Sequence, residues 1–391
     1  MILNFCLFKY FPYGGMQRDC LRLAKACYDA NYEVNIYVIK WHGIKPEGIN
    51  VLEFPQKNFH NYKKYQNFNT QVLEYINKKF SKSGIKSLNI GFNKMQGLDI
   101  YYAADGCFIT KNQKRSWIHR ITGRYRYFKK MEYAVFGNAN DDNIKNTNIL
   151  FLIDKQKQVY QDYYKTDNNR LNIMPPVIES IDFIRELNEI ISVNGSKYKN
   201  DYKEKLFQKL NIDCPKYLFL LIGSGFKTKG LDRILYGLSY LKQQGLSNFR
   251  LLVIGNDKAS SFTALINKLK LGNHITFTGG RSDIIELMHI ADLLLHPAYN
   301  ENTGKVIIEA LASGLPVICS DSCGFAKYVT NSDGGIVINN FTQDKFNANL
   351  YELIIDANKR SHFSRNGIKY GTNFQKDSDA NKLLEVINNF K

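Results

Sequence analysis

Two glutamates, Glu301 and Glu309, are the residues whose type and spacing most strongly indicate chemistry, with seven residues between them. Glu301 lies in a loop after an apolar run, and Glu309 lies inside the next predicted helix among apolar neighbours. A carboxylate in such a setting is costly to bury unless it has partners, such as a pair of ribose hydroxyls. A helix-capping acid or an ion-paired glutamate accounts for one such residue but poorly for both.

Two glycine-containing loops also lie between a predicted strand and a predicted helix, where backbone N–H groups attract anions. The first contains Gly14 and Gly15. It matches neither GxGxxG nor GxxxxGK[ST], which weakens a nicotinamide or flavin site and excludes a P-loop. The second loop, 223–233, carries Lys227 and Lys229, which can neutralise a diphosphate without a metal ion. A plain tight turn and solvated surface lysines are the alternatives.

Short apolar runs alternate with amphipathic stretches along the chain of 391 residues. The predicted strands are 2–7, 33–39, 50–54, 88–92, 99–103, 149–153, 171–174, 217–222, 250–254, 274–277, 292–295, 316–319 and 335–338. The predicted helices include 17–30, 66–80, 231–241, 261–269, 283–290, 305–312, 343–356, 361–373 and 377–389. This alternation, repeated twice, predicts an α/β fold with two doubly wound, Rossmann-like parallel sheets facing a cleft.

The domain boundary is predicted near Pro175 and Pro176, because two prolines stop a strand and stiffen a connection. The first domain then covers 1–176 and the second 177–373, with a polar stretch at 179–205. We expect the C-terminal helix, about 374–391, to pack back on the first domain.

The formal net charge of +17 is concentrated in residues 1–176, which carry 27 Lys and Arg against 14 Asp and Glu. This excess predicts a polyanionic partner. A basic segment with interleaved aromatic residues suits an anionic membrane surface, at about 1 kcal/mol per basic residue. A solvated basic loop is the alternative, and some of these cations can instead bind phosphates of an acceptor. The predicted contact residues are Lys114, Arg115, Trp117, Arg120, Arg124, Tyr125, Arg126, Lys129 and Lys130.

Composition and motifs exclude several classes of protein. A hydrophobic content of 44% excludes disorder, and no apolar run approaches the roughly 18 residues that span a bilayer. Seven cysteines without a CxxC pair suit a reduced, cytoplasmic protein. We expect no nucleic-acid partner, because RNP, helix-turn-helix and finger signatures are absent. The DxD at Asp377 and Asp379 is predicted to be a helix cap rather than a metal site.

The Glu301–Glu309 pair, followed by Ser-Gly-Leu-Pro-Val at 313–317, resembles the retaining glycosyltransferases of the two-Rossmann GT-B fold. Segments 9–19, 91–99 and 296–299 look more specifically like the lipopolysaccharide core glucosyltransferases, which transfer glucose from UDP-glucose to an inner-core heptose. The similarity covers roughly 2–375, with gaps around 40–80 and 179–205. It departs from the family at Thr228, where the family has an arginine. Lys227 can supply a positive charge in its place, but a lysine cannot donate the two parallel hydrogen bonds of an arginine guanidinium.

The resemblance implies a UDP-sugar donor, no cofactor and no metal. Glu309 would hold the ribose and Glu301 the hexose hydroxyls. The diphosphate would be bound by Lys229 with Gly14, Gly15 and the amides of Thr303 and Gly304, and the uracil would lie beside Arg281. Asp99 and Asp19 would orient the acceptor hydroxyl or the sugar. Diphosphate departure would be assisted by helix N-termini and Lys229, and a diphosphate oxygen would help to deprotonate the acceptor.

The implied acceptor is a phosphorylated lipid-linked oligosaccharide, and the implied location is the cytoplasmic face of the inner membrane, with the enzyme bound peripherally. Two alternatives remain within the resemblance. One is transfer from another UDP-hexose or a UDP-N-acetylhexosamine, because one hydroxyl or acetamido contact decides donor choice. The other is a sugar-nucleotide epimerase, which would need no polybasic membrane segment.

Overall fold

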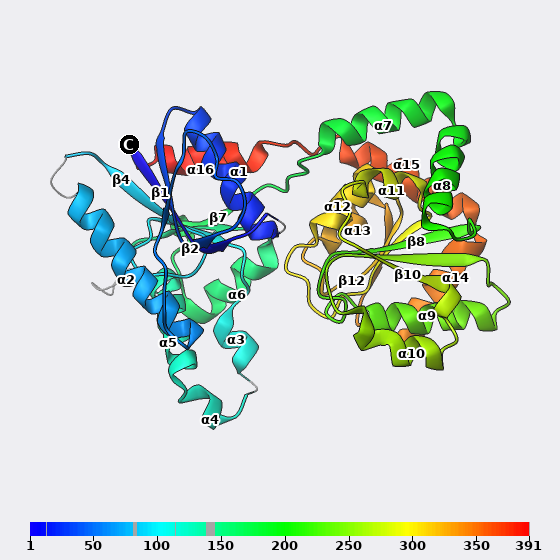
Figure 1. Cartoon of the computed structure of the whole chain (residues 1–391), viewed down its shortest axis with the longest axis horizontal. Helices are drawn as coiled ribbons and strands as arrows, with labels where there is room; N and C mark the ends of the chain where they lie inside the picture. The colour runs from blue at the N-terminus through cyan, green and yellow to red at the C-terminus, as the bar shows by residue number, and fades with distance from the viewer. Residues whose placement is uncertain (13, 81–83, 114, 138–144, 391) are drawn as a thin grey trace. The chain divides into compact units, whose positions relative to one another are not determined.

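The computed structural model describes residues 1–12, 14–80, 84–113, 115–137 and 145–390. The chain divides into two compact units, each with its own parallel sheet (Figure 1). Unit 1 comprises Met1–Pro175 and Ser378–Lys391, and unit 2 comprises Pro176–Asp377. Among the helices of the described part of the chain, none is both long enough and apolar enough to cross a membrane.

Unit 1 is built on a seven-stranded parallel sheet with the strand order β3-β2-β1-β4-β5-β6-β7. The strands are β1 (Ile2–Tyr10), β2 (Glu33–Trp41), β3 (Asn50–Glu53), β4 (Ser87–Gly91), β5 (Ile100–Ala103), β6 (Asn148–Phe151) and β7 (Leu171–Ile173). The central position of β1 follows from its composition, because a strand that is covered on both faces reads as a nearly continuous apolar run.

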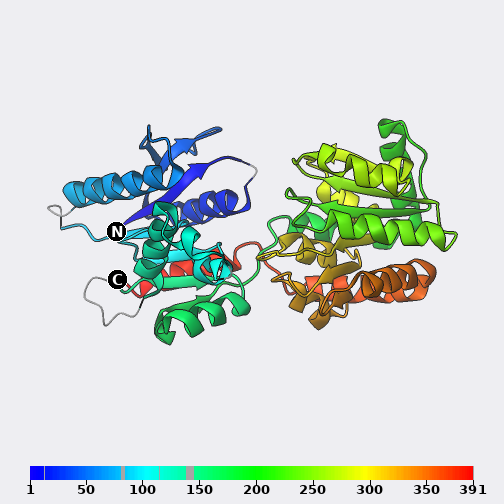
Figure 2. The same cartoon turned by 90° about the horizontal axis from the view of Figure 1, so that it is seen from below.

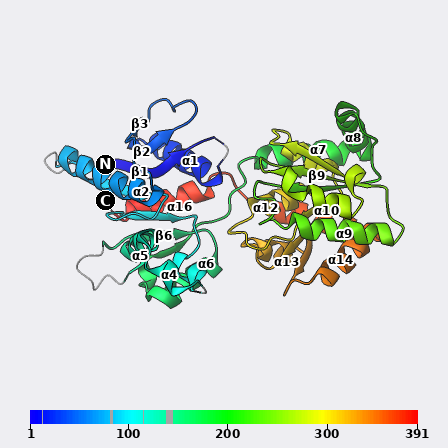
Figure 3. The same ribbon diagram turned by 60° about the horizontal axis from the view of Figure 1, so that its bottom comes forward.

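Helices cover both faces of this sheet. They are α1 (Gly15–Asp29), α2 (Asn61–Phe80), α3 (Phe108–Asn112), α4 (Trp117–Arg120), α5 (Gly123–Phe136), α6 (Asp154–Tyr164) and α16 (Ser378–Asn388), with a 3-10 turn at Asn168–Arg170. Leu3 and Phe5 of β1 pack with α1 and with Leu383 of α16, whereas Ile2 and Cys6 face α2, α5 and α6. Helices α4, α5 and α6 lie side by side (Figure 3).

A chain of asparagine side chains crosses the sheet of unit 1 beneath its apolar surface. Asn50 Nδ2 donates to Asn35 Oδ1, Asn35 Nδ2 donates to Asn4 Oδ1, and Asn4 Nδ2 donates to Asn89 Oδ1, at 3.1, 3.3 and 3.2 Å. Asn89 Nδ2 ends the chain on the carbonyl oxygen of Gly97 at 3.1 Å. Because buried amides are costly unless paired, this chain fixes the register of β3, β2, β1 and β4.

Unit 2 is built on a six-stranded parallel sheet with the order β10-β9-β8-β11-β12-β13. Its strands are β8 (Tyr217–Ile222), β9 (Phe249–Ile254), β10 (Ile275–Gly279), β11 (Leu293–His296), β12 (Val317–Ser320) and β13 (Gly335–Ile338). Helices α9 (Leu231–Gln243), α10 (Thr263–Lys268) and α14 (Gln343–Ile355) share one apolar core.

The other helices of unit 2 are α7 (Ile181–Asn194), α8 (Ser196–Leu210), α11 (Ile284–Ile290), α12 (Lys305–Ala312), α13 (Ala326–Ser332) and α15 (Ala357–Gly371), with 3-10 turns at Ala259–Phe262 and Gly272–His274. Helices α11 and α12 lie across the sheet from α9 and α10 (Figure 1), and α14 lies beside α15 (Figure 2). Both sheets are doubly wound, which confirms the predicted α/β fold class.

Each predicted strand is present, and most boundaries differ by one to three residues. The polar stretch 179–205, for which no element was predicted, forms most of α7 and α8. Only Ile181, Ile184 and Leu187 of α7 are buried, so the apolar stripe that marks a covered helix is short there.

Candidate functional site

The candidate site of unit 2 lies at the carboxyl ends of its strands, where glycines bring the loops close together. Gly223 and Gly255 follow β8 and β9 and have positive φ angles of 113° and 145°. A Cβ on Gly255 would lie 2.8 Å from the carbonyl carbon of Gly223, and one on Gly230 would lie 2.2 Å from the carbonyl oxygen of Pro297. Glycine is therefore required where these loops pack backbone against backbone.

Lys229 and Glu301 meet at this edge as an ion pair between Nζ and Oε2. His296, the last residue of β11, is fully buried, and its Nε2 lies 3.5 Å from the same oxygen. Neither ring nitrogen of His296 has a closer hydrogen-bond partner within the described ranges. Burial alone raises the pKa of Glu301, but His296 and the charge of Lys229 outweigh it and lower the pKa from 4.5 to about 2. Glu301 is thus a fixed negative charge.

Arg233 holds the loop that carries Glu301 in place. The guanidinium of Arg233 lies 3.6 Å from the ring centroid of Tyr299 and donates to the carbonyl oxygens of Pro297 and Ala298 at 2.9 and 3.1 Å. The Tyr299 hydroxyl donates to Asp232 at 2.8 Å. Arg233 therefore positions this loop, and its guanidinium does not replace the family's arginine at position 228.

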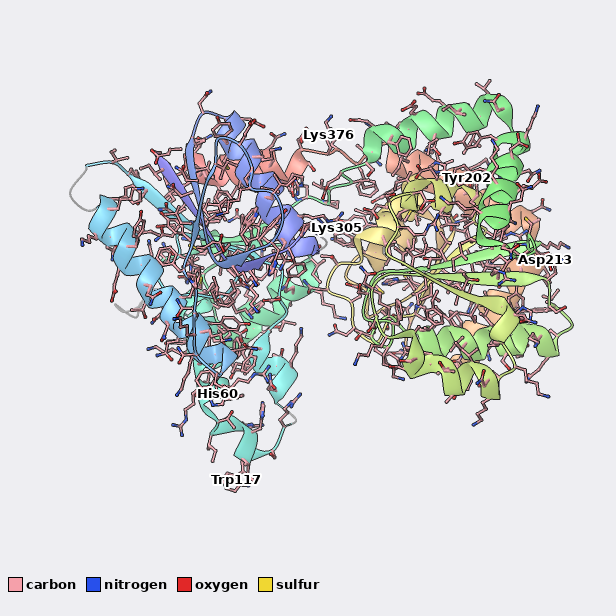
Figure 4. The ribbon with its side chains drawn as sticks, in the orientation of Figure 1. His60, Trp117, Tyr202, Asp213, Lys305 and Lys376 are labelled. Carbon is pink, nitrogen blue, oxygen red and sulfur yellow. The ribbon has the colours of Figure 1, made fainter. Side chains whose placement is uncertain are left out.

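The start of α12 offers backbone donors beside Glu301. Gly304 takes a left-handed conformation with φ of 81° directly before the helix. Within the described part of the chain, the N–H groups of Thr303 and Gly304 have no hydrogen-bond acceptor. Two open N–H groups at the positive end of a helix form a site for an anion. Glu309 lies farther along α12 and is half-buried, and Lys305 begins the helix (Figure 4).

Two other predicted donor-binding cations have carboxylate partners. Lys227 Nζ lies 2.5 Å from Asp232 Oδ2, and its side chain is 70% exposed. Arg281 binds Asp283 with two contacts, Nε to Oδ1 at 2.7 Å and Nη2 to Oδ2 at 2.5 Å. The structure therefore brings Lys229, Glu301, Thr303 and Gly304 together, whereas Lys227 and Arg281 lie on the flanks of the site.

In unit 1, the predicted glycines lie at the carboxyl end of β1, where α1 begins. A Cβ on Gly14 would lie 2.0 Å from Gln17 Oε1, so the fold itself requires glycine there. A Cβ on Gly15 would meet no described atom within 4 Å. Nothing in the described part of the chain therefore demands glycine at position 15, and the predicted contact of Gly15 with a ligand stays a prediction.

Of the two aspartates predicted to face the ligand, Asp99 does not lie at the carboxyl edge of the sheet. Asp99 precedes β5 and therefore lies at the amino end of that strand. Its Oδ2 accepts from the Asn89 N–H at 2.8 Å, and its Oδ1 pairs with Lys145 at 2.7 Å. Asp19 is only 3% exposed and accepts a hydrogen bond from the Tyr102 hydroxyl at 2.9 Å. The predicted position of Asp99 is corrected accordingly, because it lies at the amino end of β5, whereas the role of Asp19 stays a prediction.

Sequence reasoning missed Asp105, which follows β5 at its carboxyl end and has an exposed side chain. Its position directly after a predicted strand is the signal that would have identified it. Next to it, Glu132 is fully buried and accepts hydrogen bonds from Lys94, the Phe108 N–H and the Ile109 N–H, at 2.5, 2.7 and 3.1 Å. These contacts fix the start of α3 just beyond Asp105.

The basic segment forms α4 and the first turns of α5. Trp117 is 71% exposed, and Ile118 and Ile121 are also exposed beside Arg120. Trp117 lies at the tip of α4 (Figure 4). Among the remaining predicted contact residues, Arg115, Arg124, Arg126, Lys129 and Lys130 are exposed and Tyr125 is half-buried, while Lys114 lies outside the described residues.

The paired parallel sheets and the anion-binding edge of the second sheet define a glycosyltransferase of the GT-B fold. Residues 202–370 match the family described as glycosyl transferases group 1. The chain is 35% identical over 389 residues to the lipopolysaccharide glucosyltransferase WaaG of Escherichia coli strain K12, covering 99% of this chain and 98% of that protein. It therefore belongs to the glycosyltransferase family that includes WaaG.

Solved structures agree with this assignment. A crystal structure of WaaG, a glycosyltransferase involved in lipopolysaccharide biosynthesis, has a TM-score of 0.85 and 33% identity, covering 98% of this chain and 99% of that one. The structure of Anabaena HepE in complex with UDP-glucose has a TM-score of 0.70 and 16% identity, with both chains covered completely. The second likeness shows the shared fold alone.

Proposed function

We propose that this glycosyltransferase moves glucose from UDP-glucose to a heptose of the lipopolysaccharide inner core. The observation that carries the proposal is the edge where Lys229, the open N–H groups of Thr303 and Gly304, and Glu301 converge. Cations and amides suit a diphosphate, and a fixed carboxylate suits sugar hydroxyls. The identity to WaaG, named as a lipopolysaccharide glucosyltransferase, favours glucose and this class of acceptor.

In the proposed complex, the diphosphate lies against Lys229 and the start of α12, and Glu301 accepts hydrogen bonds from the hexose. Glu309 binds the ribose hydroxyls, and Arg281 lies beside the uracil. Lys227 and the Gly14-Gly15 turn add positive charge and backbone donors for the phosphates. Glu301 suits its part because its lowered pKa keeps it ionised at neutral pH, where it accepts hydrogen bonds.

We propose a retaining reaction without a covalent sugar–enzyme intermediate. The bond between the anomeric carbon and the diphosphate oxygen breaks, and negative charge develops on the diphosphate. Lys229 and the α12 amides stabilise that charge, and each such donor typically contributes about 10²–10³-fold in rate. A diphosphate oxygen then takes the proton of the acceptor hydroxyl as that hydroxyl attacks from the same face. Asp105 is available to orient the acceptor hydroxyl.

The reaction is proposed to need no metal ion, with Lys229 and the amides of α12 in the place that a metal would take. Among the described residues, no group of three or more His, Cys, Asp or Glu side chains is arranged to hold one. We expect full activity in excess EDTA. Abolition of activity by EDTA, with recovery on adding Mg²⁺ or Mn²⁺, would contradict this part of the proposal.

The acceptor is proposed to be reached from an anionic membrane surface, at the cytoplasmic face of the inner membrane. The support is the exposed aromatic and apolar side chains of Trp117, Ile118 and Ile121 among basic residues, which suit a membrane interface. Arg115, Arg120 and Arg124, with Lys114, Tyr125 and Lys129, supply charge and further interfacial contact. Arg126 and Lys130 belong to the same segment.

The deciding experiment measures hydrolysis of UDP-glucose, UDP-galactose and UDP-N-acetylglucosamine by the purified protein without acceptor. We expect UDP-glucose to be hydrolysed fastest, because donor specificity resides in the contacts of the hexose pocket. Preference for another donor would replace glucose in the proposal. Release of UDP together with an epimerised sugar, and no binding to anionic vesicles, would favour the sugar-nucleotide epimerase instead.

A further inference from the structure

A second candidate site lies within unit 1, in a cavity of about 530 Å³ between α2 and α5. Three cations line it: Lys63 from α2, and Arg126 and Lys130 from α5. The residues that line the cavity include no acid, and none of the three cations pairs with a carboxylate anywhere in the described ranges. All three side chains are exposed, so solvent screens their charges, but three cations around one cavity, without a carboxylate partner among the described residues, favour an anion there.

Two of the residues that line the cavity, Asn69 and Tyr127, have buried polar side chains. Asn69 is 4% exposed and Tyr127 is 7% exposed. Asn69 Oδ1 and the Tyr127 hydroxyl make no hydrogen bond to any described residue. Leaving such a group unpaired costs about 1–3 kcal/mol. Both atoms are closed off from solvent, so a ligand gains that free energy where the two side chains turn towards the cavity. Asn69 Oδ1 needs a donor such as a sugar hydroxyl.

The cavity is lined by the first turns of both helices. The first residue of α5 is Gly123, and a Cβ there would lie 2.8 Å from the Tyr62 hydroxyl oxygen. Glycine thus lets α5 approach the start of α2. In a parallel α/β sheet, a helix that follows a strand begins near the carboxyl end of that strand, so the cavity lies toward the ligand-binding edge of unit 1.

We propose that this cavity binds a phosphorylated saccharide. Lys63, Arg126 and Lys130 bind the phosphate. The side chains of Tyr127 and Asn69 turn towards the ligand as it binds, so that the Tyr127 hydroxyl donates to the phosphate and Asn69 accepts from a sugar hydroxyl. The inference rests on the proposed function and deepens it, because it identifies a binding site for the charged part of the acceptor. It also divides the basic segment: Arg126 and Lys130 serve the cavity, whereas Trp117 and its exposed neighbours serve the membrane.

The test measures binding of glucose 6-phosphate to the full chain by calorimetry, with UDP in excess to occupy the donor site. We expect Lys63→Gln to raise the Kd about tenfold or more, because a charge-assisted contact is lost. Lys78→Gln is the matched control, since it removes the same charge from the same helix outside the cavity. We expect its Kd to equal that of the wild type.

Further probes separate the sources of phosphate. Glucose tests the sugar alone, glycerol 3-phosphate tests lipid-headgroup chemistry, and vesicles containing phosphatidylglycerol test the membrane. We expect glucose 6-phosphate to bind more tightly than either small probe, and Lys63→Gln to leave vesicle binding unchanged. Equal losses in the Lys63 and Lys78 variants would overturn the proposal. The proposal would also be overturned if Lys63→Gln weakened binding to vesicles but not binding to glucose 6-phosphate.

Tyr127→Phe provides an independent check. Removing an unpaired buried hydroxyl leaves the free protein equally stable or more stable, while it weakens the stabilisation by glucose 6-phosphate. Unchanged stabilisation by the sugar phosphate in this variant would remove Tyr127 from the site. Failure of the wild type to hydrolyse any UDP-sugar would count against the proposed function and not against this cavity, because the binding measurement does not use donor chemistry.

Discussion

Lys229 and Glu301 form an ion pair that joins the loop after β8 to the loop after β11. Both side chains are largely buried, and each charge offsets part of the free energy that burying the other one costs. The pair therefore fixes the geometry of the two loops at this edge of the sheet.

Breaking this pair should reduce stability in a pH-dependent way. Because the pKa of Glu301 is lowered from 4.5 to about 2, its contribution is complete above pH 4.5 and disappears as the pH falls toward 2. We expect Lys229→Met to lower the free energy of unfolding of unit 2 by about 3 kcal/mol at neutral pH. The difference from the wild type should shrink between pH 4.5 and 2, as followed by urea denaturation.

The control for this experiment is Lys227→Met. Lys227 also pairs with an aspartate, but its side chain is 70% exposed, so the change should cost less than about 1 kcal/mol. Equal destabilisation by the two substitutions would show that burial of the Lys229–Glu301 pair does not increase its contribution to the free energy of unfolding.

The two glutamates should separate in their effects on nucleotide binding. Glu309→Gln should weaken UDP itself by about 10–100-fold, because it removes charged hydrogen bonds to the ribose. Glu301→Gln should weaken UDP-glucose more than UDP, because its proposed partner is the hexose, while its effect on UDP comes through the loss of the ion pair with Lys229. Competition binding with UDP and UDP-glucose provides both values, and parallel losses in the two variants would contradict the assigned roles.

Membrane binding should depend on the tip of α4. We expect Trp117→Ser combined with Arg120→Gln to reduce affinity for phosphatidylglycerol vesicles by about tenfold or more, since each basic residue contributes about 1 kcal/mol near the surface. Phe59→Ser is the matched control, because Phe59 is 99% exposed in the same unit but lies outside the basic segment. Equal wild-type affinity for neutral and anionic vesicles would eliminate the electrostatic contribution.

Much of the fold was predictable because strands that are buried on both faces read as apolar runs, as in β1 and β8. Lys229 and Glu301 were predictable as site residues because each follows such a strand. The same rule locates Asp105 after β5 and puts Asp99 before it. Asp99 was chosen from family resemblance instead, and its strand position indicated the opposite edge.

Other features depend on pairing between distant segments, which sequence pattern does not encode. The asparagine chain from Asn50 to Asn89 is one example, because each amide alone reads as an ordinary polar residue. The cavity between α2 and α5 is another. Its cations come from Lys63 and, more than sixty residues later, from Arg126 and Lys130, so only tertiary structure assembles it.

The DxD near the C-terminus offers a test of how α16 is held. Asp379 is 3% exposed and forms a bidentate pair with Arg22 of α1, in which the Nη1–Oδ1 distance is 2.6 Å. Asp377, two residues earlier, is exposed. We expect Asp379→Asn to destabilise unit 1 by about 3 kcal/mol, because Arg22 would lose its bidentate partner and keep a longer contact of 3.5 Å with Asp19.

Asp377→Asn should change stability by less than about 0.5 kcal/mol and leave activity unaltered, because an exposed side chain outside any special contact contributes little. Urea denaturation and the UDP-glucose hydrolysis rate, measured on both variants, check the two expectations together. If Asp377→Asn instead abolished hydrolysis in a way that added divalent metal reversed, the DxD would act as a metal site, and the helix-docking role inferred from the Arg22 contact would be insufficient.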